Sequence, residues 1–201
     1  MKSPRLIAAT IVLALSAGCA STRIVDTWTV PEAAPQPHRA LVVAVMPDEA
    51  TRRNLEEHLA AELHEQGVDA VPSLQFLPDL STYQRDQLRD AVHDVAVQRG
   101  FDTVIVSRYH GVATEYRYVP SSYGWYDYWA YPNPWVYSPG YLDTRTLARI
   151  ETSAFDPRSG RLIWTATSET VQTSPGSRLP VGSVASRVVK AMKKDGVIGP
   201  S

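Results

Sequence analysis

The sequence predicts an α/β (α+β) fold: a single-domain sandwich in which a mixed sheet of five to six strands is covered by two or three helices. Residues 40–106 alternate between short β-branched runs and amphipathic segments, which indicates parallel strands with helical crossovers. Residues 112–119 and 146–167 alternate apolar with polar side chains, which indicates an antiparallel meander. An aromatic-rich insertion separates these last two segments.

The parallel part begins with an uninterrupted apolar run over residues 40–46, typical of a strand buried on both faces. A helix is predicted over Thr51–Gln66, because leucines recur every four residues at Leu55, Leu59 and Leu63. Gly67 stands where a left-handed residue ends a helix, and a short strand over residues 68–71 follows.

A second helix is predicted to start at Ser81, which has the spacing of a capping box with Gln84, and to run to about Arg99. Gly100 ends it, and residues 101–106 form the next strand. The apolar face of this helix consists of Leu88, Ala91, Val92, Val95 and Ala96.

The meander is predicted from strands over residues 112–119, 146–155 and 162–167. Gly111 indicates a bulge, and the Asp156–Gly160 segment has the composition of a turn. Pro180 marks the first turn of a last helix, which Gly196 ends. Its apolar side consists of Val181, Val184, Ala185, Val188 and Met192.

The first residues have the layout of an export signal. Lys2 and Arg5 precede an apolar run over residues 6–15, which is too short to span a bilayer as a helix. We therefore expect a signal peptide over residues 1–18, a lipidated N-terminus and tether over 19–38, and the α/β domain over 39–198. Within the tether, Ile24–Trp28 could form a short strand, with Trp28 packed on the domain.

The end of this leader resembles the bacterial lipobox, in which cleavage falls between Gly18 and Cys19 and the cysteine thiol then carries diacylglycerol. Ser16 stands where leucine is usual, with Leu15 one place further back. By resemblance to the lipoproteins of bacteria with two membranes, the non-aspartate Ala20 favours export to the inner leaflet of the outer membrane, facing the periplasm. The plainer interpretation makes Cys19 a small residue near an ordinary cleavage site, and a catalytic thiol is less favoured because it needs a pocket and a base.

Composition narrows the classes of partner. Without the leader the chain has 18 basic and 21 acidic residues, a net charge of −3, and no basic block, which argues against nucleic acid. The single cysteine excludes an intrachain disulfide, so the domain must be held together by its core.

Residues 120–141 form a Tyr/Trp/Pro-rich insertion that is almost free of charge. A loop this long is usually functional or disordered, and disordered segments are poor in aromatics. It could pack on its own sheet, form a binding surface for an envelope protein or glycan, or touch the bilayer interface near the anchor. The candidate partner-binding residues are Tyr123, Trp125, Tyr126, Tyr128, Trp129, Tyr131, Trp135 and Tyr137.

Familiar catalytic motifs are missing from the sequence: it has no nucleophile elbow, phosphate loop or dinucleotide fingerprint. His58 and His64 are six residues apart, so they lie on different faces of the predicted helix, unlike the pair of a zinc helix. The five histidines are interpreted as solvated or helix-edge residues, and Asp69 and Asp102 as turn residues. We expect no catalytic residues, no metal and no cofactor.

Several motifs together resemble a family of uncharacterised bacterial lipoproteins of the domain-of-unknown-function type. The motifs are Cys19, the residues that follow it at 21–22 and 25–28, and the segments 41–45, 51–53, 68–73, 101–106, 159–164 and 194–198. The resemblance implies no known activity and transfers no site residue. The sequence thus predicts a non-catalytic binding or scaffolding protein, anchored in the cell envelope. The alternatives are an envelope hydrolase or ligand-binding enzyme, which would need ionisable groups converging in one pocket, and a structural protein with its rings packed inward.

Overall fold

The computed structural model describes residues 22–31, 36–119, 141–172 and 178–199. The predicted leader, Cys19 and the candidate aromatic residues from Tyr123 to Tyr137 lie outside these ranges. No helix in the described ranges is long and apolar enough to cross a membrane.

Six strands form one mixed sheet in the order β1-β6-β5-β4-β2-β3, which confirms the predicted fold class. Strand β2, next to the edge strand β3, is parallel to both β3 and β4, whereas β4, β5, β6 and β1 pair antiparallel in turn. The strands are β1 (Thr22–Thr29), β2 (Arg39–Val45), β3 (Asp69–Pro72), β4 (Thr103–Val119), β5 (Tyr141–Phe155) and β6 (Leu162–Gln172).

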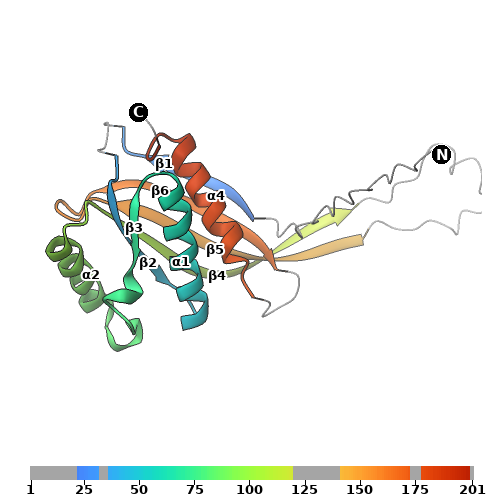
Figure 1. Cartoon of the computed structure of the whole chain (residues 1–201). Helices are drawn as coiled ribbons and strands as arrows, with labels where there is room; N and C mark the ends of the chain where they lie inside the picture. Colours follow the sequence, from blue (N-terminus) through green and yellow to red (C-terminus); the bar gives the residue numbers. More distant parts are fainter. Residues whose placement is uncertain (1–21, 32–35, 120–140, 173–177, 200–201) are drawn as a thin grey trace, which may run out of the picture.

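Helices α1 (Glu49–Glu65) and α4 (Val181–Lys194) lie side by side on one face of the sheet, and α2 (Arg85–Arg99) lies apart from them (Figure 1). Strand β2 shows how the layers are divided. Ala40, Val42 and Ala44 belong to the core beneath α1 and α4, and Leu41 and Val43 to the smaller core beneath α2. The strand is therefore buried on both faces, as its continuous apolar run predicts.

The segment predicted as a tether contributes an edge strand. Strand β1 pairs with β6 from Thr22 opposite Thr170 to Thr29 opposite Trp164. The expectation that Trp28 packs on the domain is wrong, because its side of β1 faces away from α1 and α4 and the residue is 46% exposed. Ile24 instead packs against the core.

Helix α2 begins later than predicted. Its capping box consists of Gln84 and Gln87, whereas Ser81 lies in a short 3-10 turn, η2 (Leu80–Thr82). The cause is Asp79, whose carboxylate accepts hydrogen bonds from the Ser81 amide at 2.8 Å and from the Ser81 hydroxyl at 2.6 Å. With its hydroxyl engaged in this way, Ser81 is not the cap of α2. A second short turn, η1 (Ser73–Gln75), follows β3.

Residues 103–119 form one long strand with a bulge. The register of β4 against β5 shifts between Tyr109 and Val112, and Gly111 between them has a φ of +89°, which confirms the predicted bulge. Strand β2 pairs with β4 only as far as Arg108, and β6 with β5 only up to Thr146. The outer parts of β4 and β5 extend past the helices as a narrow ribbon (Figure 1). This segment, which we call the β4–β5 ribbon, comprises residues 112–119 and 141–148. Residues 146–148 still pair with β6, so that only 115–119 and 141–145 form two strands alone.

Candidate binding surface

Helix α2 covers only the parallel part of its face of the sheet, so the antiparallel part presents polar side chains beyond it. The strand register places these side chains on the side opposite α1 and α4, and we call this surface the open face. It consists of Arg23, Asp26 and Trp28 from β1; Thr165, Thr167 and Glu169 from β6; Arg149, Glu151 and Ser153 from β5; and Arg108, His110 and Glu115 from β4.

Glu169 is the most enclosed acid of the open face, with a side chain 5% exposed. One of its carboxylate oxygens accepts a hydrogen bond from Arg23 Nη2 at 2.8 Å, and the other accepts one from Arg149 Nε at 2.8 Å. These strands are neighbours in the register, which brings both guanidinium groups over one carboxylate. Hydrogen bonds from Arg23 and then Arg149 hold the pKa of Glu169 below its ordinary value despite burial.

The two arginines remain accessible from outside. The side chains of Arg23 and Arg149 are 60% and 52% exposed, and Arg23 also lies 4.0 Å from a Glu115 oxygen. The hydrogen bond and charge of Glu169 raise the pKa of Arg23 further above its ordinary value. A guanidinium carries five N–H donors in a fixed plane, so donors remain on each for a ligand's oxygen atoms.

A row of uncharged groups crosses the same face. Trp28, Thr165 and Ser153 are neighbours across β1, β6 and β5, and the Ser153 and Thr165 hydroxyl oxygens are 2.8 Å apart. Next to this row, His110 Nε2 lies 3.4 Å from Glu151 Oε2. The open face therefore offers charged donors and acceptors, hydroxyls and one indole ring on a rigid sheet, a composition suited to holding a polar partner.

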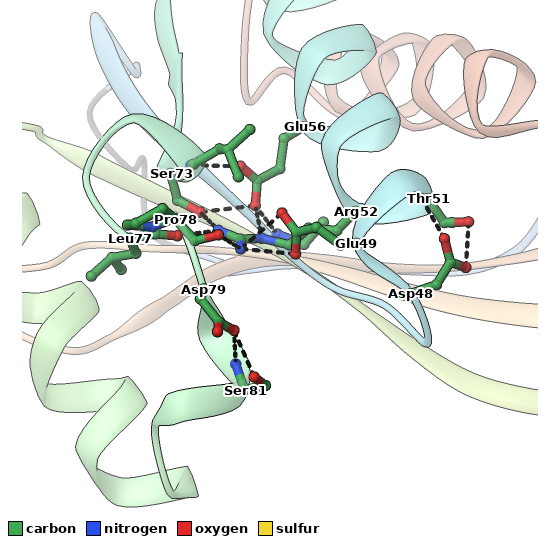
Figure 2. Close-up of polar contacts among 12 residues, drawn as sticks. Asp48, Glu49, Thr51, Arg52, Glu56, Ser73, Leu77, Pro78, Asp79 and Ser81 are labelled. Atoms are coloured by element: carbon green, nitrogen blue, oxygen red, sulfur yellow. Dashed lines mark hydrogen bonds and ion pairs between the residues drawn. The ribbon is translucent and has the colours of Figure 1, made fainter.

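A second polar cluster is internal. Glu56 accepts hydrogen bonds from the Ala44 amide, Arg52 Nε and Ser73 Oγ on one oxygen, at 2.9, 3.1 and 2.8 Å, and from the Leu74 amide on the other, at 3.0 Å. Figure 2 shows Glu56, Arg52 and Ser73 converging between α1 and the segment after β3. Because Glu56 is 0% and Arg52 2% exposed, this cluster fastens a loop to a helix and presents nothing to a ligand.

Arg52 completes the internal cluster from the other side. Its Nη2 donates to the Leu77 carbonyl at 2.7 Å and to Ser73 Oγ at 3.2 Å, and its Nη1 reaches the Pro78 carbonyl at 3.3 Å (Figure 2). One guanidinium therefore donates the hydrogen bonds that the carbonyls of this loop, which pairs with no strand, would otherwise lack. The cluster fixes the path of the chain from β3 towards α2.

The acids and histidines noted in the sequence have local roles. Asp102 accepts hydrogen bonds from the His38 and Arg39 amides at 3.0 and 3.1 Å, at the start of β2. Asp48 caps α1, and the bonds from Thr51 hold the pKa of Asp48 below its ordinary value. The side chains of His38, His64, His93 and His110 are between 46% and 87% exposed, as their interpretation as solvated residues predicts.

The described residues contain no group of three His, Cys, Asp or Glu side chains that could hold a metal ion. Between α1 and α4, within the same ranges, a shallow polar groove is lined by Glu62, Glu65, Gln66, Ser186, Val189, Lys190 and Lys193. Lys193 Nζ donates to Gln66 Oε1 across this groove at 2.8 Å, so the groove is partly bridged by its own side chains.

The open face was not among the predicted sites. Cys19 and the aromatic candidates lie outside the described residues, so their assignment as site residues stays a prediction. The sequence did carry one signal for the open face, because Arg149 and Glu151 occupy the wetter side of an alternating strand. That signal could not show that Arg23, well over a hundred residues away, shares Glu169 with Arg149.

No family model matches the chain, and no curated protein matches it. The PelC dodecamer from Paraburkholderia phytofirmans is a similar solved structure, with 14% identity and a TM-score of 0.47 over 90% of this chain and 99% of that one. Lipoprotein GNA1162 from Neisseria meningitidis has 18% identity and a TM-score of 0.45 over 79% and 99%. At these identities and TM-scores the comparisons assign no function to this chain.

Proposed function

We propose that this chain is a lipid-anchored protein of the bacterial cell envelope that binds an envelope protein or glycan through its open face, without catalysing a reaction. The observation that carries the proposal is the accessibility of charged and aromatic groups on a rigid sheet, around Arg23, Arg149 and Trp28. A binding surface needs such groups to be presented in a fixed geometry, because ordering flexible side chains costs affinity.

The proposed anchor is the thiol of Cys19. Support comes from the leader, whose apolar run ends in small residues before the chain's single cysteine. Strand β1 begins at Thr22, so the chain between Cys19 and the sheet spans at most about 11 Å. An acylated Cys19 would hold the domain directly at the membrane surface, and the open face would then be presented to partners close to that surface.

A photo-crosslinker placed on the open face tests the binding role. The amino acid p-benzoylphenylalanine replaces Trp28 in one variant and Val97 in another, and both are irradiated in intact cells. Val97 lies on α2, outside the four strands that form the open face, and is similarly exposed, at 49% against 46% for Trp28, so it controls for random collisions. We expect discrete adducts from position 28 and none from position 97.

The size of the adducts after protease or muramidase digestion then separates a protein partner from a glycan. Adding Arg149→Ala to the Trp28 variant should weaken the adduct, because it removes one of the two accessible guanidinium groups. Equal crosslinking from positions 28 and 97 would refute the proposal that the open face is the binding surface.

A further inference from the structure

The β4–β5 ribbon has two chemically different faces. The register places Val112, Thr114 and Tyr116 of β4 on the same side as Leu142 and Thr144 of β5. Ala113, Glu115, Asp143 and Arg145 lie on the other side, where Arg145 Nε donates to Asp143 Oδ2 at 2.9 Å. We call the first side the apolar face of the ribbon and the second its charged face.

The apolar face is exposed to a degree unusual for this molecule. Val112, Tyr116 and Leu142 are 56%, 70% and 66% exposed, and they are half of the six large hydrophobic residues exposed in the described ranges. Single exposed apolar residues need no explanation, but a group on one side of one element marks an interaction surface. Beyond the end of β6 the ribbon consists of two strands alone, residues 115–119 and 141–145. Two such strands are marginally stable in water, so a surface that covers them would stabilise them.

The sheet topology places the ribbon and the start of β1 at the same end of the domain. Thr22, Thr170, Ala148 and Val112 form one row across β1, β6, β5 and β4. Strand β1 runs in the same direction as β5, because both are antiparallel to β6. Since β5 runs from the ribbon into the body, the chain before Thr22 leaves the sheet at the end where the ribbon projects.

The anchor and the ribbon therefore lie at the same end. Cys19 is three residues before Thr22, so the two residues are at most about 11 Å apart. Thr22 lies in the same row as Val112, three strands away across the sheet. A membrane that holds an acylated Cys19 must pass close to this end of the domain. Tyrosine and aliphatic side chains are favoured at the boundary between headgroups and acyl chains.

We infer that the apolar face of the β4–β5 ribbon rests on the lipid surface to which Cys19 is attached, so that the domain is held at two points. This inference rests on the anchoring in the proposed function. On the charged face of the ribbon two acids face two bases in the register, Glu115 opposite Arg145 and Asp143 opposite Arg117, so contact depends on apolar side chains and not on anionic lipid. A second contact would fix the orientation of the open face relative to the membrane.

Site-specific fluorescence on the full lipidated chain tests this contact. Single cysteines introduced by Tyr116→Cys, Leu142→Cys, Glu115→Cys and Arg158→Cys are labelled with an environment-sensitive nitrobenzoxadiazole maleimide. An acylated Cys19 thiol cannot react with the label. Each protein is reconstituted into vesicles of phosphatidylethanolamine and phosphatidylglycerol, with or without doxyl-labelled lipids that quench nearby fluorophores. Position 158 lies in the turn between β5 and β6, at the opposite end of the sheet, and is exposed.

We expect labels at 116 and 142 to shift to shorter wavelength and to be quenched several-fold more strongly by doxyl lipids than the label at 115. The label at 158 should be quenched least. Equal quenching at 115 and 116, or none at 116 and 142, overturns the inference. Shifted but unquenched labels whose signal depends on protein concentration would overturn it in favour of a second copy of the chain.

A second preparation separates this inference from the anchor. In it, a hexahistidine tag replaces Cys19 and the residues before it, and binds nickel-chelating lipids in the same vesicles. Intact mass spectrometry of the first preparation shows whether Cys19 carries lipid. A chain without lipid refutes the proposed anchor, while the contrast between positions 116 and 115 in the tethered chain still decides whether the ribbon meets the bilayer.

Discussion

Glu56 and Glu169 are both buried and both accept hydrogen bonds from arginine, but their surroundings give them different roles. Glu56 is fully enclosed and accepts hydrogen bonds from two backbone amides, a hydroxyl and Arg52, so all of its partners are fixed parts of the fold. Glu169 lies beneath Arg23 and Arg149, whose outer sides reach solvent. A ligand on the open face can therefore change the environment of Glu169, whereas Glu56 is isolated from any ligand.

Replacing Glu169 by glutamine should remove part of the acid sensitivity of folding. The folded pKa of Glu169 lies below its ordinary value of 4.5, so its ionised form stabilises the fold above that pH. This contribution is lost as pH falls through the folded pKa. We expect Glu169→Gln to cost about 1.5–3 kcal/mol at pH 7, the range for hydrogen bonds to charged groups, and progressively less below pH ~4.5.

Urea denaturation of both proteins between neutral and acidic pH measures this difference. The carboxylates of Asp48, Asp79 and Asp156 also have lowered pKa values, so the wild type loses stability in acid for several reasons, and only the comparison isolates Glu169. Glu151→Gln, at a half-exposed pair with His110, is the matched control and should change stability by less than about 1 kcal/mol. A pH-independent difference between wild type and Glu169→Gln would contradict the assignment.

At the scale of elements, α1 and α4 approach closely where α4 begins. A Cβ added at Gly182, the second residue of α4, would stand 3.6 Å from the His58 ring, which is ordinary van der Waals contact. Gly182→Ala should therefore stabilise the protein by about 0.5–1 kcal/mol, since alanine loses less backbone entropy in a helix. Thermal unfolding followed by circular dichroism measures the change.

Gly100→Ala provides the contrast for that prediction. Gly100 ends α2 with a φ of +72° and has no atom within 4 Å of an added Cβ, so only its backbone conformation resists the change. We expect a loss of about 1–2 kcal/mol there. Destabilisation by Gly182→Ala would mean that α1 and α4 pack more tightly than the structure describes.

Sequence reasoning found most elements because their signals are local. The leucine stripe at Leu55, Leu59 and Leu63 is buried as predicted, and Gly111 marks the bulge. It misplaced the start of α2 because both Ser81 and Gln84 have cap-like spacing, and only the tertiary path decides that Asp79 binds Ser81. It also treated residues 101–106 and 112–119 as separate strands, since a bulge interrupts alternation without interrupting the strand.

At the scale of the whole molecule, the proposed attachment depends on the thiol of Cys19, three residues before the sheet begins. Cys19→Ala should move the protein from the membrane fraction to the soluble fraction of the envelope and abolish incorporation of labelled palmitate, because the ribbon alone offers little apolar area. Fractionation with immunoblotting measures the shift. Retention of the variant in the membrane with unchanged processing would refute the anchor.

The candidate sites show where sequence reasoning ends. A lipobox is contiguous, so the sequence alone can propose Cys19 and Gly18. The open face is assembled from four strands whose order is β1-β6-β5-β4, and no local pattern specifies that the N-terminal strand joins the last one. Arg23 and Glu169 therefore become neighbours only through the completed sheet.

The pairing of β1 with β6 also sets an order of events during synthesis. Thr22 and Thr170, whose hydroxyl oxygens are 2.9 Å apart, are separated by 148 residues, so the first strand made must wait for the last strand before it has a partner. Closing so long a loop before any ladder forms is slow. In a chain that emerges from a translocation channel with its N-terminus first, β1 would thus have no partner strand until β6 has emerged.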